Sequence, residues 1–445
     1  MTARLTRTAL IDRYHRYGRP RTKWLVGGEF ERHILDVNGM PATYDGEPGI
    51  RSLLQSLVQR GWQPIRERGA LIGCVRENGA NVTLEPGAQF ELSGAPHKTP
   101  HEVLEEARTF AATVDELLAG TSLRQATLGL TPTSDMARIR WVPKGRYVIM
   151  RNHMARSGPL GQTMMKGTAA TQASYDYEHE FDAAQKLKLA RNIAPLVTAM
   201  FANSPYQHGQ ATGWMSSRGR VWMYTDPART GFPDSLNEYR HERWVDYLLD
   251  VPMMFMRKGS RWLPANGKSF RTWMSETGPD APTWADWELH QTSVFPEVRI
   301  KAQIEVRGAD CVNLPLAGAF VALFHGLFYC PRSRDEALAL GAQFSAFGSQ
   351  RQRFEDACRY GLRATVGGRR MAWWASRLLT IAAEGRARCS PDAPDMLAPL
   401  EALVSKGITP ADVLLYHLGR LPDIGALLEL TAPDGRAFRQ AADVT

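Results

Sequence analysis

Cysteines are few in this sequence, and their spacing marks neither a metal cluster nor a disulfide framework. The 445 residues contain five cysteines, an odd number, and no two of them show Cys-x-x-Cys spacing. Free buried thiols in a reducing compartment are therefore the expected state. A single regulatory disulfide is the alternative that the sequence leaves open.

Long apolar runs are also absent. The N-terminus is basic and polar through Trp24 and lacks the apolar core of a signal peptide. No stretch reaches the roughly 18 apolar residues of a membrane-spanning helix, and His325 interrupts the nearest run, Leu314 to Phe328. We therefore expect no membrane partner and a cytoplasmic location.

The common nucleotide and nucleophile motifs are missing as well. The sequence has no GxSxG, no GxxxxGK[ST] and no GxGxxG, so no protein nucleophile is expected. The net charge of +8 comes from Lys and Arg spread along the whole chain. Because they do not cluster with stacking aromatics, we expect no nucleic-acid partner, and anionic small molecules fit this charge.

Helices and strands are mixed without a regular βαβ alternation, which predicts an α+β fold with an antiparallel sheet. After Pro331 the sequence is mostly helical. Thr409-Pro410-Ala411-Asp412 predicts a helix start. Amphipathic patterns predict earlier helices at residues 5–17, 48–60, 100–119 and 180–202. Strands are expected at 23–34, 70–77, 80–84, after Pro86-Gly87, and at 297–307. Long binding loops are expected at 154–170 and 203–240.

Polar side chains that include glutamate recur at spacing two in three of these strands. Side chains two apart on a strand share a face, so Glu29 lies beside Glu31. Two further strands have such a face, made by Gln89, Glu91 and Ser93 and by Gln303, Glu305 and Arg307. A solvated sheet face explains one such strand, but Glu is depleted in strands and adjacent carboxylates repel each other. Three strands together favour a shared metal site, and Mg²⁺ prefers such oxygen ligands together with nucleotide phosphates.

The same segments resemble a known family. Residues 84–96, Leu-Glu-Pro-Gly-Ala-Gln-Phe-Glu-Leu-Ser-Gly-Ala-Pro, look like the signature of glutamate–cysteine ligases of the plant and proteobacterial branch. The resemblance covers roughly residues 5–430. Further matching stretches follow in the family's order: Pro143-Lys144-Gly145-Arg146-Tyr147, Met150-Arg151-Asn152, Phe201-Ala202-Asn203-Ser204-Pro205, Asp226 with Arg229-Thr230-Gly231, Val245-Asp246-Tyr247, Asp250-Val251-Pro252-Met253, Phe295-Pro296-Glu297-Val298-Arg299, and Glu305-Val306-Arg307-Gly308-Ala309-Asp310.

The resemblance implies a glutamine-synthetase-like architecture, in which a curved antiparallel sheet forms an active-site funnel covered by helices. It implies one catalytic body over residues 1–445. The sheet funnel and its active-site loops would occupy 23–310, and the mostly helical part at 331–445 would pack on it. The resemblance also implies that ATP and Mg²⁺ bind at the glutamate-rich strands. The implied metal ligands are Glu29, Glu31, Glu85, Gln89, Glu91 and Glu305.

The implied reaction has two steps and needs no protein nucleophile. The side-chain carboxylate of glutamate attacks the γ-phosphate of ATP, and the amine of cysteine then displaces phosphate from the acyl phosphate. The partners are thus a small-molecule amino acid and an amine. Because a guanidinium binds a carboxylate bidentately, Arg229 and Arg307 are the expected catalytic residues. The expected substrate-binding residues are Arg151, Asn152, Arg218, Arg229, Gln172 and Asp176.

Several positions depart from the family pattern. Phe30 stands in place of a His, Ala88 in place of a Gly, and Lys166-Gly167 in place of a Leu-Arg pair. The segment Cys311 to Phe324 lacks the Gly-Gly-Pro-Trp-Arg-Arg-like run of the family. Three hypotheses follow: a glutamate–cysteine ligase, a diverged ligase of the same chemistry with another amine or acid, and a non-catalytic binding protein.

Overall fold

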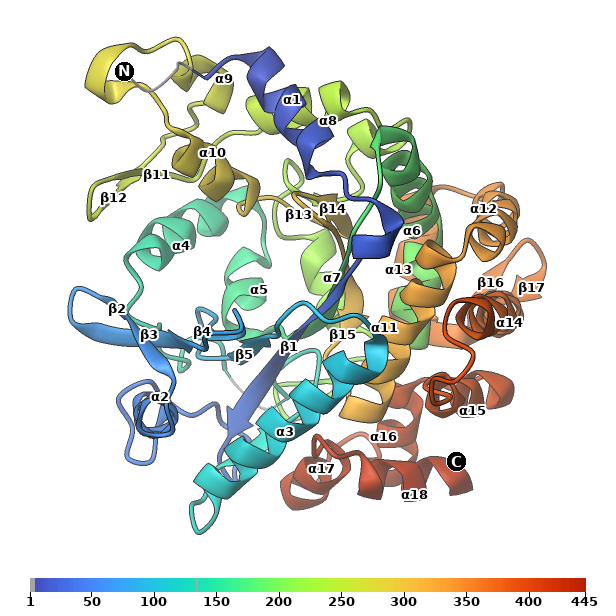
Figure 1. The fold of residues 1–445 in the computed structure, drawn as a ribbon. Helices are drawn as coiled ribbons and strands as arrows, with labels where there is room; N and C mark the ends of the chain where they lie inside the picture. Colours follow the sequence, from blue (N-terminus) through green and yellow to red (C-terminus); the bar gives the residue numbers. More distant parts are fainter. Residues whose placement is uncertain (1–4, 133–134) are drawn as a thin grey trace.

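The computed structural model describes residues 5–132 and 135–445 and is built around one large sheet (Figure 1). Within the described residues, nine strands form it in the order β14-β15-β7-β1-β5-β4-β3-β2, with β6 paired to β1. Every pairing is antiparallel, which confirms the expected α+β fold. The strands are β1 (Val26–Leu35), β2 (Gln63–Glu67), β3 (Ala70–Val75), β4 (Asn81–Leu84), β5 (Phe90–Ser93), β6 (Arg124–Ala126), β7 (Ala170–Tyr175), β14 (Val298–Ile300) and β15 (Ile304–Asp310).

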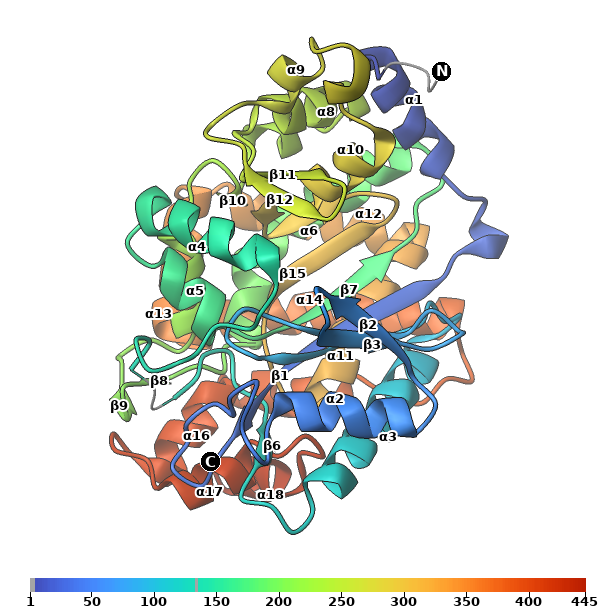
Figure 2. The ribbon, with the colours of Figure 1, turned by 90° about the vertical axis from the view of Figure 1, so that its left-hand side faces the viewer.

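Helices cover one face of this sheet (Figures 1 and 2). The covering helices α3 (Pro100–Leu118), α6 (Glu180–Met200) and α11 (Leu314–Tyr329) contact β1, β15 and β7 respectively. Phe30, Phe90 and Leu92 point into this core and are almost fully buried. The alternation of these residues with glutamates therefore separates a packed face from a polar one.

The C-terminal part is mostly helical, as expected. The side chain of Thr409 accepts a hydrogen bond from the Asp412 N–H, and the Asp412 side chain caps in return, which confirms this helix start. The helices after Pro331 are α12 (Pro331–Ser345), α13 (Gln350–Tyr360), α14 (Met371–Cys389), α15 (Ala398–Lys406), α16 (Pro410–Leu418), α17 (Ile424–Leu430) and α18 (Arg436–Val444); β16 (Thr365–Val366) and β17 (Arg369–Arg370) form a small hairpin among them.

The polar face of the sheet looks toward a second group of elements (Figure 2). A two-stranded hairpin of β11 (Phe255–Lys258) and β12 (Arg261–Pro264) contacts α4 (Gly145–Ser157), and α4 contacts α5 (Gly161–Gly167). The remaining elements are α1 (Arg7–Tyr17), α2 (Ile50–Gln59), α7 (Ser217–Met223), α8 (His241–Asp250), α9 (Phe270–Trp273), α10 (Trp284–Gln291), the pair β8 (Tyr206–Gln207) and β9 (Gln210–Ala211), the pair β10 (Thr230–Gly231) and β13 (Phe295–Pro296), and the 3₁₀ turns at Arg21–Lys23, Asp234–Leu236, Gly278–Asp280 and Gly361–Arg363.

Two expectations about local structure were wrong. Residues 297–307 are not one strand: the chain turns after Ile300, so that Arg299 pairs with Glu305 in an antiparallel hairpin. The segments expected to be long loops contain α5 and α7. Both helices are only seven residues long, and tertiary burial of residues such as Met164, Met165 and Val221 stabilises them rather than helix propensity.

All five cysteines are free, and each except Cys389 is buried. In the described part of the chain, no single helix is long and apolar enough to cross a membrane. In these residues only α11 and α12 taken together are long and apolar enough, and the two helices are bent by 102° relative to each other.

Candidate active site

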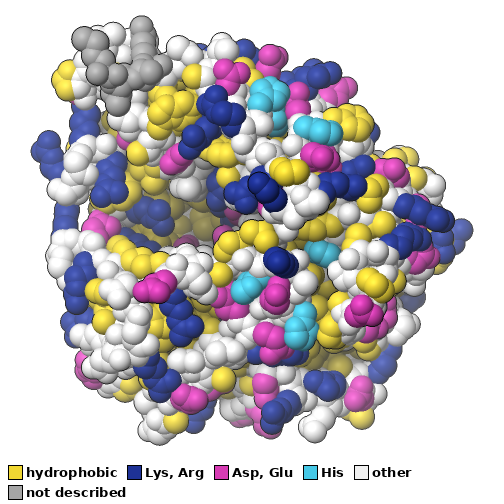
Figure 3. Space-filling model, viewed as in Figure 1, with side chains coloured by type: hydrophobic (Ala, Val, Ile, Leu, Met, Phe, Trp, Pro, Cys, Tyr) yellow, Lys and Arg dark blue, Asp and Glu magenta, His cyan; other side chains and the backbone are white. Residues whose placement is uncertain are grey.

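A cavity of about 350 Å³ opens over the polar face of the sheet. Figure 3 shows this side of the molecule hollowed, with basic side chains at the edge and inside. Strands β1, β4, β5 and β7 supply the floor, and α4, α5, α7 and the 289–307 region supply the walls. The cavity therefore lies where the glutamate faces were expected to meet.

Two of the floor glutamates are cross-strand partners. Glu31 on β1 lies directly opposite Glu91 on β5. Glu31 accepts hydrogen bonds from the backbone N–H of Ala170 at 2.6 Å and from Gln172 Nε2 at 3.1 Å. Glu91 accepts from the hydroxyls of Thr83 and Ser93, both at 2.9 Å. These bonds fix four carboxylate oxygens within one patch of the floor.

The carboxylates of this floor repel one another. Burial and the charges of Glu85 and Glu91 raise the pKa of Glu31 well above its ordinary value. Burial and the charge of Glu85 likewise raise the pKa of Glu91. For Glu29, burial and the charges of Glu305 and Glu91 raise the pKa to about 7. The raised pKa values show that the nearby cationic side chains do not fully balance the negative charge of these glutamates.

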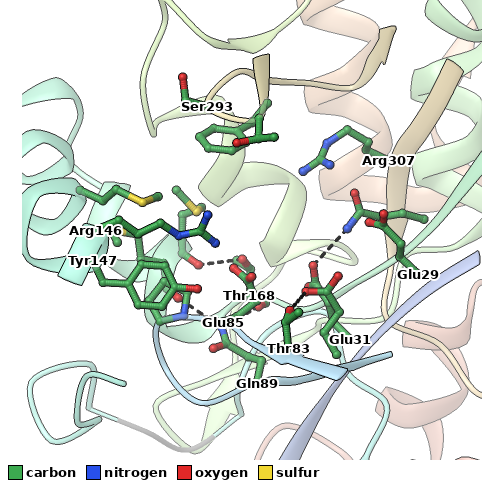
Figure 4. A pocket seen from close by; sticks show the side chains of 18 of the residues that line it. Glu29, Glu31, Thr83, Glu85, Gln89, Arg146, Tyr147, Thr168, Ser293 and Arg307 are labelled. Carbon is green, nitrogen blue, oxygen red and sulfur yellow. Dashed lines mark hydrogen bonds between the residues drawn. The ribbon is translucent and has the colours of Figure 1, made fainter. Parts of the chain in front are cut away.

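This donor set fits Mg²⁺ bound together with a ligand. In the described residues, no three His, Cys, Asp or Glu side chains are grouped closely enough to hold a metal on their own. Mg²⁺ does not need such a cage, because it usually takes one or two carboxylates, substrate phosphates and water. The residues that fit are Glu29, Glu31, Glu85 and Glu91, which line the cavity and form no ion pair in the described residues. Figure 4 shows the first three of them.

Glu305 has a different environment from the other glutamates. It forms ion pairs with Arg299 at 2.9 Å, with Lys301 at 3.1 Å and with Arg307. Although burial alone would raise it, these charges hold the pKa of Glu305 well below its usual range. Glu305 is thus compensated by protein cations, and its first role in this arrangement is to orient Arg299 and Arg307, which line the cavity.

Arg146 is a cavity residue that the sequence analysis missed. It projects from the first turn of α4 and faces Arg307 across the cavity (Figure 4). Its Nε is buried without a hydrogen-bond partner, and it forms no ion pair among the described residues. The stretch 143–147 carried the signal, since it was among the matching motifs, but no role was assigned to its arginine.

Arg218 and Gln172 line the cavity as expected for substrate-binding residues. Arg218 Nη2 donates to the Arg307 carbonyl at 3.0 Å, and its Nε has no partner in the described part of the chain. The Gln172 Oε1 is likewise buried and unpartnered there. Each residue therefore keeps a donor or an acceptor for a ligand.

Gln89 acts as a brace for the floor. Its Oε1 accepts from the Gly87 N–H at 2.9 Å, and its Nε2 donates to the carbonyls of Met165 and Thr168. With both ends of its amide bound to backbone, Gln89 holds the turn after Glu85 against α5, which departs from the metal-ligand role expected for it. Ala88, in the same turn, has φ +71°, a conformation that explains the glycine of the family pattern.

Arg229, expected to be both a catalytic and a substrate-binding residue, is a structural residue. Its side chain is fully buried, lies outside the cavity lining and pairs with Asp226 at 2.6 Å. It also donates to the carbonyls of Ser293 and Pro252. Its Nε and both of its terminal nitrogens thus donate to protein groups, which departs from the catalytic and substrate-binding roles expected for it.

Three other expected substrate residues also lie outside this cavity. Arg151 stacks over Trp141 at 5.5 Å, and Asn152 is exposed on α4. Asp176 accepts a hydrogen bond from the Leu25 N–H at 2.9 Å and fixes the segment that precedes β1. Helical spacing explains why Arg151 and Asn152 lie outside the cavity. Residues four apart share one side of a helix, so Arg146 and Met150 both face the cavity, and the residues that follow Met150 point elsewhere.

The departures from the family pattern avoid the cavity too. Lys166 donates to the Met136 carbonyl and lies over Trp141, and a side chain at Gly167 would meet Met136 and Leu130. Cys311 donates to the Glu31 carbonyl and is not part of the cavity lining. The upper wall, by contrast, is apolar, which sequence analysis did not identify. It contains Met150, Met164, Met165, Trp222, Met254, Phe255, Leu289 and Phe295.

Comparisons with known proteins agree on one family. Residues 25–429 match the model of glutamate-cysteine ligase family 2. Glutamate–cysteine ligase B of Oryza sativa subsp. japonica, a chloroplastic protein, is 33% identical over 93% of this chain and 84% of its own. The chloroplastic glutamate–cysteine ligase of Arabidopsis thaliana is also 33% identical, over 93% of this chain and 80% of its own.

Solved structures show the same fold at low identity. A glutamate–cysteine ligase from Francisella tularensis, in complex with AMP, matches 95% of this chain and 88% of its own with TM-score 0.57 and 11% identity. A bifunctional glutathione synthetase from Pasteurella multocida matches 98% of this chain and 54% of its own with TM-score 0.52 and 13% identity.

Proposed function

This chain belongs to glutamate-cysteine ligase family 2 and is a ligase of that family, and we propose that it joins the side-chain carboxylate of glutamate to the amine of cysteine with ATP. One observation carries the proposal. An acidic floor whose carboxylates form no ion pair in the described residues faces arginines on two sides of one cavity. A floor of this kind suits a magnesium nucleotide, and the arginines suit the anionic groups of an amino acid or a phosphate.

The residues of this chain would act mainly by positioning and by electrostatics. Mg²⁺, when bound by Glu29, Glu31, Glu85 and Glu91, would neutralise phosphate charge. Arg146, Arg218 and Arg307 would orient the carboxylate that attacks the γ-phosphorus. ADP leaves, an acyl phosphate forms, and the amine nitrogen then attacks its carbonyl carbon. The single bond between that carbon and the phosphate oxygen breaks, phosphate leaves with this oxygen, and the amine loses a proton as the amide forms.

Cysteine suits the cavity as the amine. The departures that argued for another amine lie outside the cavity lining, at Lys166, Gly167 and Cys311. The wall itself presents methionine and aromatic surface, against which a small, weakly polar thiol side chain packs well. A diverged ligase that uses another amine is therefore the competing hypothesis, which the turnover assay below tests. The cytoplasmic location stays a prediction, and the plant relatives are chloroplastic by name.

The test is a turnover assay with Mg²⁺, ATP, glutamate and a panel of amines. The expected products are ADP, orthophosphate and γ-glutamylcysteine, measured by nucleotide chromatography and product mass. Omission of glutamate, cysteine or Mg²⁺ provides the controls. AMP and pyrophosphate as the main products would reject the acyl-phosphate route. An inert cysteine beside a reactive second amine would keep the chemistry and replace the substrate.

A further inference from the structure

Helix α4 has no N-terminal cap of its own. Lys144 at the cap position makes no capping hydrogen bond through its side chain, and the first turn contains no acidic residue. The first N–H groups of a helix need an acceptor from elsewhere. The Gly145 N–H donates instead to Oε1 of Glu67, at 2.8 Å, and Glu67 is the last residue of β2.

The same carboxylate oxygen binds a third element. Trp262 on β12 donates its indole N–H to Glu67 Oε1 at 3.0 Å. The Trp262 ring packs edge-on against Phe255, with ring centroids 5.2 Å apart, and Phe255 lines the cavity. Glu67 therefore joins the β2–β3 hairpin, α4 and the β11–β12 hairpin, which lie along one edge of the molecule in Figure 1.

The contact is close enough to restrict the residue at position 145. A Cβ atom on Gly145 would lie 2.6 Å from Glu67 Oε1 and 2.6 Å from Trp262 Cδ1. A side chain at this position would therefore displace the Glu67 carboxylate or the Trp262 ring from the helix start. The glycine permits a carboxylate on one hairpin to cap a helix elsewhere in the chain.

The capped turn carries cavity residues. Arg146 follows Gly145 directly and points into the cavity (Figure 4). On the other side of the turn, Lys144 Nζ and the Tyr147 hydroxyl each donate to the Leu84 carbonyl at 2.7 Å, one residue before Glu85. The first turn of α4 is thus fixed between Glu67 and the acidic floor.

We propose that Glu67 is a positioning residue for this site: by capping α4 and joining the two hairpins, it holds Arg146 where the anionic substrate group binds. Glu67 itself touches no substrate. The inference rests on the proposed function, because it assigns Arg146 to a ligand of that reaction. An error of about 1 Å in such a group can cost about a hundredfold in rate.

Three variants distinguish a role of Glu67 in positioning Arg146 from a role in stabilising the fold alone. Glu67→Gln keeps an acceptor oxygen for both donors, Glu67→Leu removes it, and Trp262→Phe removes one donor while keeping the ring. Glu77→Leu, an exposed carboxylate at the neighbouring turn, is the matched control. We expect Glu67→Leu to lower kcat/KM about 10- to 100-fold, with Trp262→Phe intermediate, and Glu67→Gln and Glu77→Leu close to the wild type.

The KM values show whether Glu67 acts on the reaction through Arg146. Glu67→Leu should raise the KM of the same substrate that Arg146→Gln affects, and the double variant should be little worse than Arg146→Gln alone. Effects that simply multiply, or a raised KM for a different substrate, would overturn the proposal. So would an unchanged kcat/KM in Glu67→Leu.

A readout without turnover separates this inference from the proposed function. Backbone amides of residues 145–150 should exchange hydrogen faster in Glu67→Leu and normally in Glu67→Gln, while exchange in the distant helix α14 stays constant. Unchanged exchange at 145–150 in Glu67→Leu would contradict the cap even in an active enzyme. Faster exchange in a protein that turns over no acid and amine would leave the cap standing and reject the proposed reaction.

Discussion

Glu31 and Glu91 lie directly opposite each other on neighbouring antiparallel strands, in the floor of the cavity. Like charges at such a position destabilise a sheet by roughly 0.2–1 kcal/mol relative to neutral pairs. No protein cation is paired with either carboxylate in the described residues. The sheet thus keeps an unfavourable pair at the place where a cationic ligand would turn it into a favourable one, which is the usual conflict between stability and function.

The first prediction follows from this pair. Without Mg²⁺, Glu91→Gln should raise the free energy of unfolding by up to about 1 kcal/mol, while turnover with Mg²⁺ and ATP falls. The amide can keep both hydrogen bonds, because the hydroxyls of Thr83 and Ser93 accept as well as donate. Chemical denaturation in EDTA is the measurement. Glu77→Gln, at the exposed turn after β3, is the control, and a Glu91→Gln protein less stable than that control would contradict the prediction.

The second prediction separates Glu85 from Glu305. Glu85 makes no ion pair in the described residues, and its charge repels Glu31 and Glu91. Glu85→Gln should therefore not lower the melting temperature, while it should weaken Mg²⁺-dependent turnover about 10- to 100-fold. Glu305→Gln leaves Arg299, Lys301 and Arg307 without their shared anion, so it should lower both turnover and melting temperature. Mg²⁺ titration beside a thermal melt tests both. Equal melting temperatures in the two variants would show that the three cations do not need Glu305.

The third prediction concerns the turn after Glu85. A Cβ atom on Gly87 would lie 2.1 Å from the Lys166 carbonyl oxygen, which is backbone and cannot move aside easily. Gly87→Ala should therefore displace Glu85 from α5 and reduce both stability, by about 1–3 kcal/mol, and turnover. In Gly341→Ala the nearest atom would be 3.4 Å away, inside a helix, so that control should be neutral or slightly stabilising. Near-normal turnover in Gly87→Ala would mean that the turn is free to shift.

The fourth prediction is a pH dependence of stability. Burial lowers the pKa of His325 to about 4, from an ordinary 6.5. Between these values the unfolded chain binds more protons than the folded one, so stability is lost as the pH falls below 6.5. His325→Phe, which keeps an aromatic ring beside Tyr329, should reduce the loss between about pH 7 and about pH 5 by about 2 kcal/mol. Unfolding at both pH values measures it, with the exposed His101→Gln as the control that should change nothing.

The local sequence determined the faces of the strands and the starts of several helices. Strand side chains alternate strictly, so the positions of Glu29, Glu31 and Glu91 opposite buried Phe30, Phe90 and Leu92 could be read without a structure. Helix caps such as Thr409 depend on residues three apart and were equally accessible. The recurrence of such faces on three strands already favoured a shared site, and the family resemblance added the nucleotide and the reaction.

Only the tertiary structure decided which long side chains reach the cavity. Arg146 and Arg229 both stand in matching motifs, yet Arg146 points at the acidic floor and Arg229 is buried against Asp226. A guanidinium follows whichever anion or carbonyl the fold brings near it, and those partners come from distant parts of the chain. The same reason applies to Glu67, whose role depends on Gly145 and Trp262, 78 and 195 residues away in sequence. Periodicity along one segment determines the direction of a side chain, but its partner is set by how the segments pack.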